Sequence, residues 1–146
     1  MLSTTSQYAL RALLVLAAEP AERLVPGKDM ARLAQIPSNY LSKIMITLAG
    51  AGLVEAARGS NGGYRLRRPA DQIHLIEVVS LFDRQLTPKA CFLGVRAECS
   101  DHDPCTAHMA WKTVKAELVE FLDGATLDKI SGPTLKKARP PRRKSA

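Results

Sequence analysis

Proline interrupts the apolar pattern in the first half of this chain so often that only short helices can form there. Pro20, Pro26 and Pro37 each stand at the edge of an apolar segment, and a proline inside a helix removes a hydrogen bond and clashes with the preceding turn. Between these breaks, apolar residues recur at intervals of three and four, the spacing that lines one face of a helix. The inner faces comprise Leu10, Leu13, Leu14 and Ala17 in a first helix, Met30, Leu33 and Ala34 in a second, and Leu41, Ile44, Met45 and Leu48 in a third. Only 5% of the residues are aromatic, so the expected fold is mostly α.

The second and third of these helices form a closely spaced pair. They are joined by residues 35–37, and Ser38 is expected to cap the third helix. The outward residues of the third helix would be Asn39, Tyr40, Ser42 and Lys43. A short turn followed by a polar outer face is typical of a helix-turn-helix, although many small helical domains contain such a pair only for core packing.

A glycine-rich turn follows the helix pair. Residues 53–57 and 64–67 have the composition of strands, and the turn between them, Arg58-Gly-Ser-Asn-Gly-Gly63, supplies glycines where a positive φ is needed. A helix pair followed by a basic β-hairpin is a winged helix, which places one helix in the major groove of DNA and the basic wing on phosphates or in the minor groove. The alternative is that these arginines form a solvated strand edge that discourages pairing with other chains.

Charge is unevenly distributed along the chain, whose net charge is +7. Residues 28–68 hold seven basic and two acidic residues, whereas residues 71–128 hold five basic and ten acidic ones. The first half is therefore expected to lie along a polyanion, and the second is not. The expected DNA contacts are Lys28, Ser38, Asn39, Tyr40, Ser42, Lys43, Arg58, Ser60, Asn61, Gly62 and Arg65.

The second half contains helical segments and one long irregular one. The apolar run 73–82 is expected to form a helix that closes the DNA-binding core, whereas residues 87–104 lose all periodicity, and loops of that length are usually functional. A long helix is expected from Cys105 or Thr106 to Asp123, with an apolar stripe made by Trp111, Val114, Leu118, Phe121 and Leu122. In so small a chain, the same helix of a second subunit is the expected cover for that stripe, which indicates a homodimer.

These patterns divide the chain into four expected parts. They are a winged helix-turn-helix DNA-binding domain at 1–83, a cysteine-containing sensor loop at 84–104, a dimerisation helix at 105–130 and a disordered basic tail at 131–146. No segment approaches the roughly 18 to 20 uncharged apolar residues of a membrane span, and no convincing secretory signal is present. Three cysteines, an odd number, argue against a disulfide framework. A reducing cytoplasm, without a membrane partner, is therefore the expected location.

Three cysteines and a histidine gather in and after the irregular segment. Cys91, Cys99, Cys105 and His108 follow the pattern C-x7-C-x5-C-x2-H. Thiolates and imidazole suit zinc, copper(I) and iron–sulfur clusters, and the absence of paired C-x2-C knuckles favours an iron–sulfur cluster over zinc. The alternatives are a thiol redox switch, a chance or buried apolar grouping of the thiols, and a packing role for His108. In the last case the fourth ligand would be Asp101, His102, Asp103 or a residue from the N-terminal helix of a partner subunit.

Other function classes fit less well. No arrangement of Ser, His and Asp matches a nucleophile motif, so the chain is not expected to be an enzyme. A small electron-transfer protein could use the same cluster, but it would have no need of a helix pair with a glycine-rich wing. A DNA-binding regulator that uses zinc or thiol oxidation at the same cysteines stays open.

From about Ser3 to about Ile130 the chain resembles the IscR/NsrR-type (Rrf-type) family of bacterial winged-helix regulators. The matching motifs are Tyr8-Ala-Leu-Arg-Ala-Leu13, Tyr40-Leu-Ser-Lys-Ile44, Ala51-Gly-Leu-Val54, Arg58-Gly-Ser-Asn-Gly-Gly-Tyr-Arg-Leu66, the three cysteines and Cys105-Thr-Ala-His-Met-Ala-Trp111. The resemblance implies a homodimer that binds palindromic promoter DNA and an iron–sulfur cluster whose state alters DNA affinity. It also implies a [2Fe-2S] cluster on the three cysteines and His108. Nitric-oxide-sensing members of the family carry an acidic residue near the position of Gln7, and this residue ligates a [4Fe-4S] cluster. Gln7 is a poor anionic ligand, so the resemblance favours [2Fe-2S] over [4Fe-4S].

Overall fold

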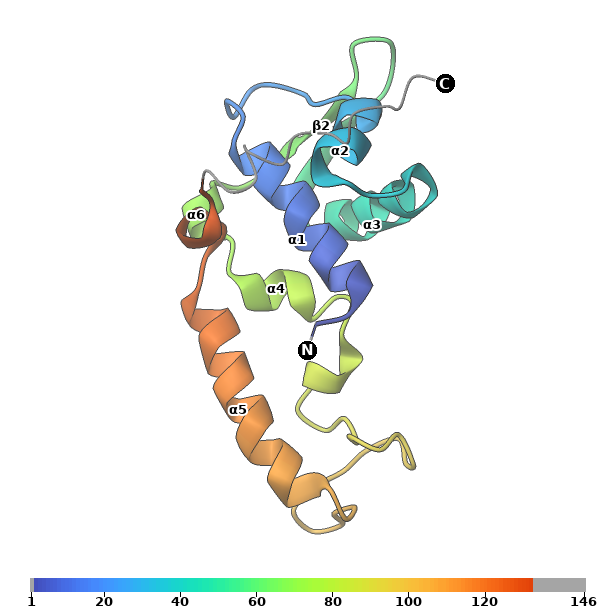
Figure 1. The fold of residues 1–146 in the computed structure, drawn as a ribbon, viewed down its shortest axis with the longest axis vertical. Helices are drawn as coiled ribbons and strands as arrows, with labels where there is room; N and C mark the ends of the chain where they lie inside the picture. The colour runs from blue at the N-terminus through green and yellow to red at the C-terminus, as the bar shows by residue number, and fades with distance from the viewer. Residues whose placement is uncertain (1, 133–146) are drawn as a thin grey trace, which may run out of the picture.

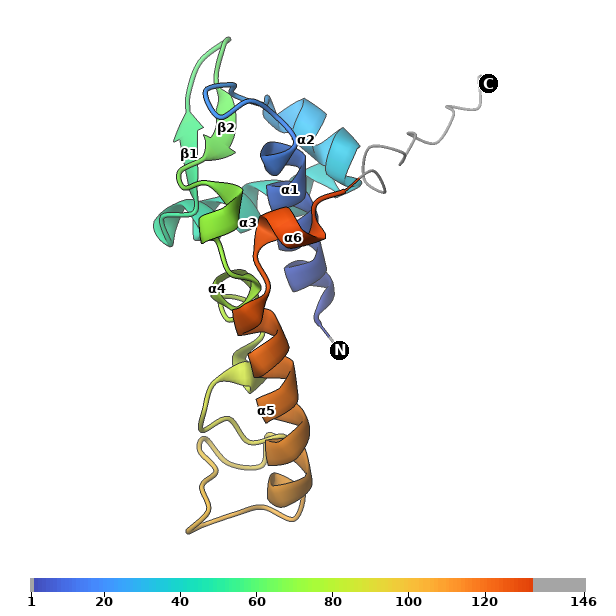
Figure 2. The same ribbon diagram turned by 90° about the vertical axis from the view of Figure 1, so that its left-hand side faces the viewer.

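The computed structural model describes residues 2–132, so the tail expected from residue 131 lies outside them from residue 133 onward. In chain order the elements are α1 (Thr4–Ala17), α2 (Gly27–Ala34), α3 (Ser38–Gly50), β1 (Val54–Ala57), β2 (Gly63–Leu66), α4 (Leu75–Val79), α5 (His108–Gly124) and α6 (Leu127–Ile130). The molecule consists of a head, formed by α1 to α4, the hairpin and α6, and an arm, formed by α5 with an irregular loop beside it (Figure 1). The view turned by 90° shows the hairpin at one end and the arm at the other (Figure 2).

Helix α1 is the centre of the head. Its N-cap is Ser3, whose hydroxyl accepts a hydrogen bond from the backbone N–H of Ser6 at 3.1 Å. The fully buried residues of the helix include Ala9, Ala12, Leu13 and Leu16, whereas the predicted stripe residues Leu10, Leu14 and Ala17 are only half-buried. Of the predicted stripe only Leu13 is fully buried, because α1 packs against α2, α3, α4, α6 and β2 at once and therefore buries a different set of positions.

Helices α2 and α3 form the predicted helix pair. The four apolar positions predicted to face inward from α3 are all buried. On α2, Leu33 is 37% exposed, so its predicted place in the core is wrong; Met30 and Ala34 alone of that helix are buried. Ser38 is the first residue of α3, after Pro37, and its side chain caps nothing. The turn between the helices passes through Gln35, which has a left-handed conformation with φ of 55°.

The predicted hairpin is present and pairs with a third segment. Strands β1 and β2 are antiparallel, with Val54 opposite Leu66 and Ala57 opposite Gly63. Val25 exchanges two backbone hydrogen bonds with Tyr64, of 2.8 Å and 2.9 Å, which ties the hairpin to the segment before α2. Strand β2 is therefore hydrogen-bonded to β1 on one side and to Val25 on the other.

At Gly63 the wing lies directly against the segment before α2. Its φ is +155°, and a Cβ atom there would lie 2.4 Å from the carbonyl oxygen of Val25. We expect Gly63→Ala to lower the free energy of unfolding by about 2 kcal/mol, measured by urea denaturation. Gly50→Ala is the matched control, because nothing lies within 4 Å of the added Cβ, and it should not destabilise the protein. Equal midpoints for the two variants would contradict this account of the wing.

The segment 73–82 is not the single helix that its apolar pattern predicts. Helix α4 covers only Leu75–Val79. Ahead of it, His74 pairs with Thr126 in an isolated β-bridge, and the N–H of Leu75 bonds to the carbonyl of Ala125 at 2.9 Å. These long-range hydrogen bonds hold the first residues of the segment extended, so a tertiary contact overrides helical periodicity.

Asp83 joins the head to the loop that follows it. Asp83 is 3% exposed, and its carboxylate accepts a 2.5 Å hydrogen bond from the hydroxyl of Ser6 and longer ones from the backbone N–H of Ser3. These donors belong to the first turn of α1, where the helix dipole favours a negative charge. The buried carboxylate therefore fixes the start of the loop to one end of α1.

The long helix exists but begins later than expected. Helix α5 starts at His108, and the predicted start at Cys105 or Thr106 is wrong because the residues before His108 form turns. A break at Ala125 and Thr126 separates α5 from α6. Among residues 2–132, no helix has the length and apolar character needed to cross a membrane. The fold is the predicted mostly α winged helix-turn-helix with a long C-terminal helix.

Candidate DNA-binding surface and metal site

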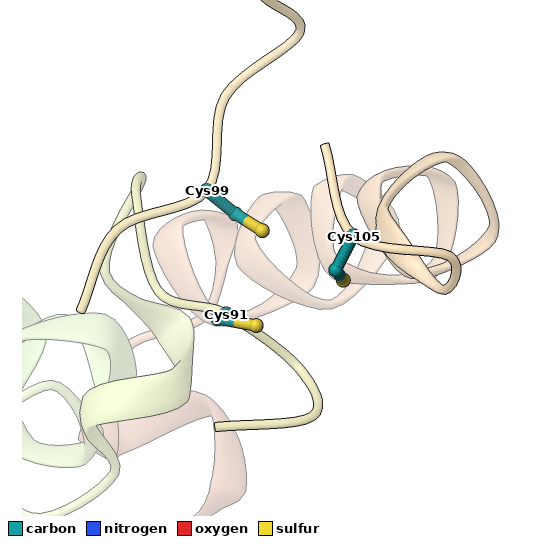
Figure 3. Close-up of side chains that lie close together, drawn as sticks. All are labelled: Cys91, Cys99 and Cys105. Atoms are coloured by element: carbon teal, nitrogen blue, oxygen red, sulfur yellow. The ribbon is translucent and has the colours of Figure 1, made fainter. Parts of the chain in front are cut away.

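The three cysteines meet at the end of the arm. Their sulfur atoms lie within 4.8 Å of one another, and the close-up shows them pointing into one space (Figure 3). Cys91 and Cys99 come from the irregular loop and Cys105 from its last residues before α5. All three are free thiols, with Cys99 buried and the others half-buried. Thiols in this arrangement can bind a soft metal or oxidise to a disulfide.

The surroundings of the three thiols shift the pKa of Cys91 and of Cys99 in opposite directions. Burial works to raise the pKa of Cys91, but hydrogen bonds from the N–H of Val95, the Cys99 thiol and the N–H of Leu93 outweigh it and lower that pKa to about 6. For Cys99 burial prevails, and its pKa is raised. The hydrogen bonds to Cys91 favour its thiolate form, which is the form that binds metals.

Contacts that sequence reasoning missed hold the loop against α5 and hold two parts of the loop together. The Phe92 and Trp111 rings pack with centroids 5.1 Å apart. The guanidinium of Arg96 pairs with Asp103 at 2.5 Å across a turn of the loop, and Lys115 donates hydrogen bonds to the carbonyls of residues 87 and 88. No periodic pattern in the sequence signals these contacts, because an irregular loop has no repeating face.

His108 lies beside the thiol cluster but is bonded elsewhere. Its Nε2 is 2.8 Å from a carboxylate oxygen of Asp101, whose other oxygen pairs with Lys112 at 2.6 Å. Lys112, with a smaller contribution from His108, lowers the pKa of Asp101 to about 2. Within residues 2–132, the one group of three or more histidine, cysteine, aspartate or glutamate side chains whose ligand atoms all lie within 4.8 Å of one another is the three cysteines. The role of His108 as fourth ligand therefore stays a prediction.

The expected DNA contacts lie on α2, α3 and the hairpin. Exposed side chains among them are Lys28, Ser38, Asn39, Tyr40, Ser42, Lys43, Arg58, Ser60 and Asn61. Gly62 is half-buried, and a Cβ there would lie 2.2 Å from the carbonyl oxygen of Ala57, so the turn needs a glycine. Arg65 is half-buried and pairs with Glu55 at 2.7 Å, which leaves it less free than Arg58 to meet a phosphate.

The structure has the features of a winged-helix transcription regulator. They are a helix pair with a polar outer face, a glycine-rich wing and an arm that carries three cysteines. Over residues 2–132 the chain matches the model of the Rrf2 family, described as an iron-dependent transcriptional regulator. The chain belongs to the Rrf2 family. Members of this family are DNA-binding regulators and not enzymes, in agreement with the expectation from the sequence.

Individual relatives support this assignment. The chain is 36% identical over 139 residues to protein aau3 of Rhizobium meliloti, covering 95% of this chain and 86% of that protein. It is 31% identical over 129 residues to the regulator IscR of Pectobacterium atrosepticum, covering 88% and 77%. Among solved structures, IscR of T. potens superposes with a TM-score of 0.69 at 27% identity, covering 95% of this chain and 88% of that one.

Proposed function

We propose that the protein is a homodimeric regulator whose affinity for promoter DNA depends on an iron–sulfur cluster, [2Fe-2S] in preference to [4Fe-4S]. The observation that carries this proposal is the convergence of three thiols within 4.8 Å beside the start of α5. The iron dependence in the family's description and the IscR relatives support it. In this scheme residues 1–83 bind DNA, residues 84–104 form the sensor loop and residues 105–130 form the dimerisation segment.

The donor set fits an iron–sulfur cluster. Cysteine thiolates are its usual ligands, and the pKa of Cys91 is lowered to about 6. We propose His108 as the residue that would supply the fourth ligand. Its Nε2 faces Asp101, and a ligating histidine commonly gives one ring N–H to a carboxylate while the other nitrogen binds the metal. When bound, the cluster supplies a link between the cysteines that iron supply or oxidation can make or break.

The chain's own contacts carry a change in the loop to the head. The loop starts next to Asp83, which is bonded to the first turn of α1, and ends at Cys105, three residues before α5. A rearrangement between these two points therefore changes how the arm sits against the head. In a dimer that change alters the spacing of the two heads, and palindromic half-sites about 34 Å apart accept only one spacing. The loop thus biases the population of DNA-competent dimers.

The exposed side of α5 supports dimerisation. Leu122 is the one buried residue of this helix, while Val114 and Phe121 are 56% and 59% exposed although both are apolar. Exposed apolar side chains on one helix commonly mark an association surface. A second copy of α5 is the cover we propose, as the two-fold symmetry of a palindromic site requires.

A second candidate function uses the same three thiols, which lie within 4.8 Å of one another. The low pKa of Cys91 suits zinc binding or thiol oxidation as well as a cluster, since each of these begins from a thiolate. In that case the protein would be a DNA-binding regulator that responds to zinc or oxidants at the same cysteines.

Anaerobic purification tests the two candidates directly. The sample is analysed for iron, acid-labile sulfide and zinc, and for visible absorption. About two iron and two sulfide per chain support the [2Fe-2S] proposal, and about four of each would require [4Fe-4S]. Zinc without sulfide, or metal-free protein after attempted reconstitution, would overturn the cluster and leave the second candidate. DNA affinity of loaded and unloaded protein is then compared on a duplex selected from random sequences.

Arg58→Ala tests the wing. Arg58 is exposed at the start of the hairpin turn, where we propose that it contacts DNA. We expect affinity for the selected duplex to fall about tenfold, and the slope of log affinity against log salt to decrease by about one. Lys129→Ala, on α6 at the far side of α1 from α3 (Figure 1), is the matched control and should change neither quantity. An unchanged salt slope in Arg58→Ala would rule out a phosphate contact there.

A further inference from the structure

Arg11 is the single charged residue of α1, and its contacts lead to the helix-turn-helix. Its Nη2 donates a 3.0 Å hydrogen bond to the backbone carbonyl of Gln35. Its guanidinium carbon lies 4.9 Å from the centroid of the Tyr8 ring, within the range of a cation–π interaction. One side chain of α1 therefore holds both the turn before α3 and a neighbouring aromatic ring.

Both of these contacts lead toward the first turn of α3, which begins at Ser38. Gln35 has the left-handed backbone that lets the chain leave α2, and Arg11 holds its carbonyl in place by a charge-assisted bond. The Tyr8 ring packs edge-on against that of Tyr40, with centroids 6.0 Å apart. Arg11 thus supports the start of α3 in two ways. It holds the turn before the helix, and it packs on Tyr8, which in turn contacts Tyr40 of α3.

The partial burial of Arg11 indicates that its side chain does more than place a charge in solvent. The side chain is half-buried, and its Nε has no hydrogen-bond partner among the described residues. Burying part of a charged group costs free energy unless the other polar atoms of that group make favourable contacts. A fixed, planar guanidinium can hold a carbonyl and stack on a ring at once, which a lysine ammonium cannot do in the same way.

We propose that Arg11 is a positioning residue for DNA recognition. It sets the orientation of the first turn of α3, so that Ser38, Asn39 and Tyr40 meet the base edges of the operator. This inference rests on the proposed reading role of α3, and it assigns Arg11 to sequence preference and not to general attraction for DNA.

Two duplexes of equal length test the proposal. One is selected from random sequences by the wild-type protein, and the other is its scrambled counterpart. We expect Arg11→Gln to bind the selected duplex about tenfold more weakly, with affinity for the scrambled duplex and the salt slope unchanged, because no phosphate contact is lost. Arg11→Lys should not restore preference, since it lacks the planar fork. Lys129→Gln is the control for loss of one positive charge.

The outcomes separate this proposal from its alternatives. An equal loss on both duplexes with a smaller salt slope would make Arg11 a phosphate contact and overturn the positioning role, as would full preference in Arg11→Gln. Tyr8→Leu, which removes the ring between Arg11 and Tyr40, should lose preference in the same way, and it replaces Arg11→Gln if that variant does not fold. If the wild-type protein selects no sequence, the reading role of α3 itself fails.

Discussion

Replacing Cys99 by serine should reduce the iron and sulfide bound after anaerobic reconstitution to below about a tenth of the wild-type amount. Cys99 is the most buried of the three thiols, and all three sulfurs lie within 4.8 Å. A serine hydroxyl is a hard, protonated group that does not replace a soft thiolate ligand. The measurement is a chemical assay of iron and acid-labile sulfide, with the visible spectrum recorded on the same sample.

The adjacent residue supplies the control for this substitution. Ser100→Ala changes an exposed side chain of the same loop and should keep full iron and sulfide. Under the proposed mechanism, DNA affinity of Cys99→Ser equals that of cluster-free wild type, and iron no longer changes it. If Cys99→Ser binds as much iron and sulfide as the wild type, any cluster is held elsewhere. The proposed sensor role of the loop would then be wrong.

For the homodimer proposed above, Phe121→Glu should convert the protein from a dimer to a monomer at micromolar concentration. Phe121 is 59% exposed on α5, and aromatic residues at the centre of an interface commonly contribute 2 kcal/mol or more to association. A charge buried in its place adds a desolvation cost, so we expect the dimer dissociation constant to rise by at least about 30-fold. Sedimentation equilibrium measures it, and the affinity for the selected palindromic duplex should fall in parallel.

Glu120→Lys is the matched control on the same helix. Glu120 is exposed and, as the neighbouring residue, points about 100° away from Phe121 around the helix, so the dimer should persist. A Phe121→Glu protein that sediments as the wild type does would place the association surface elsewhere and would remove the argument that links loop, arm and half-site spacing.

Local rules were sufficient for the helix pair and the wing. Pro37 and the three-and-four spacing of Leu41, Ile44 and Leu48 predict α3, because a helix buries one face and a proline cannot continue one. The glycines of 59–63 predict the hairpin turn, since the backbone there admits no side chain at Gly62 or Gly63. Each of these features depends on residues close together in sequence.

Long-range contacts decided what these rules could not predict. The helix expected at 73–82 is shortened because His74 pairs with Thr126, about fifty residues away, and the buried face of α1 is displaced because five elements pack around it. Neither contact leaves a periodic signal in the sequence. Local propensity is worth too little free energy to resist such packing.

The sequence by itself determined the winged helix-turn-helix, the residue types that suit DNA, and a set of thiols with soft-metal chemistry. Only the tertiary structure decided that the three sulfurs meet, that His108 turns to Asp101, that Asp83 ties the loop to α1, and that Arg11 holds the turn before α3. The physical reason is distance along the chain. Helices and turns are set by neighbours a few residues apart, whereas a site built from an irregular loop exists only once distant segments have packed together.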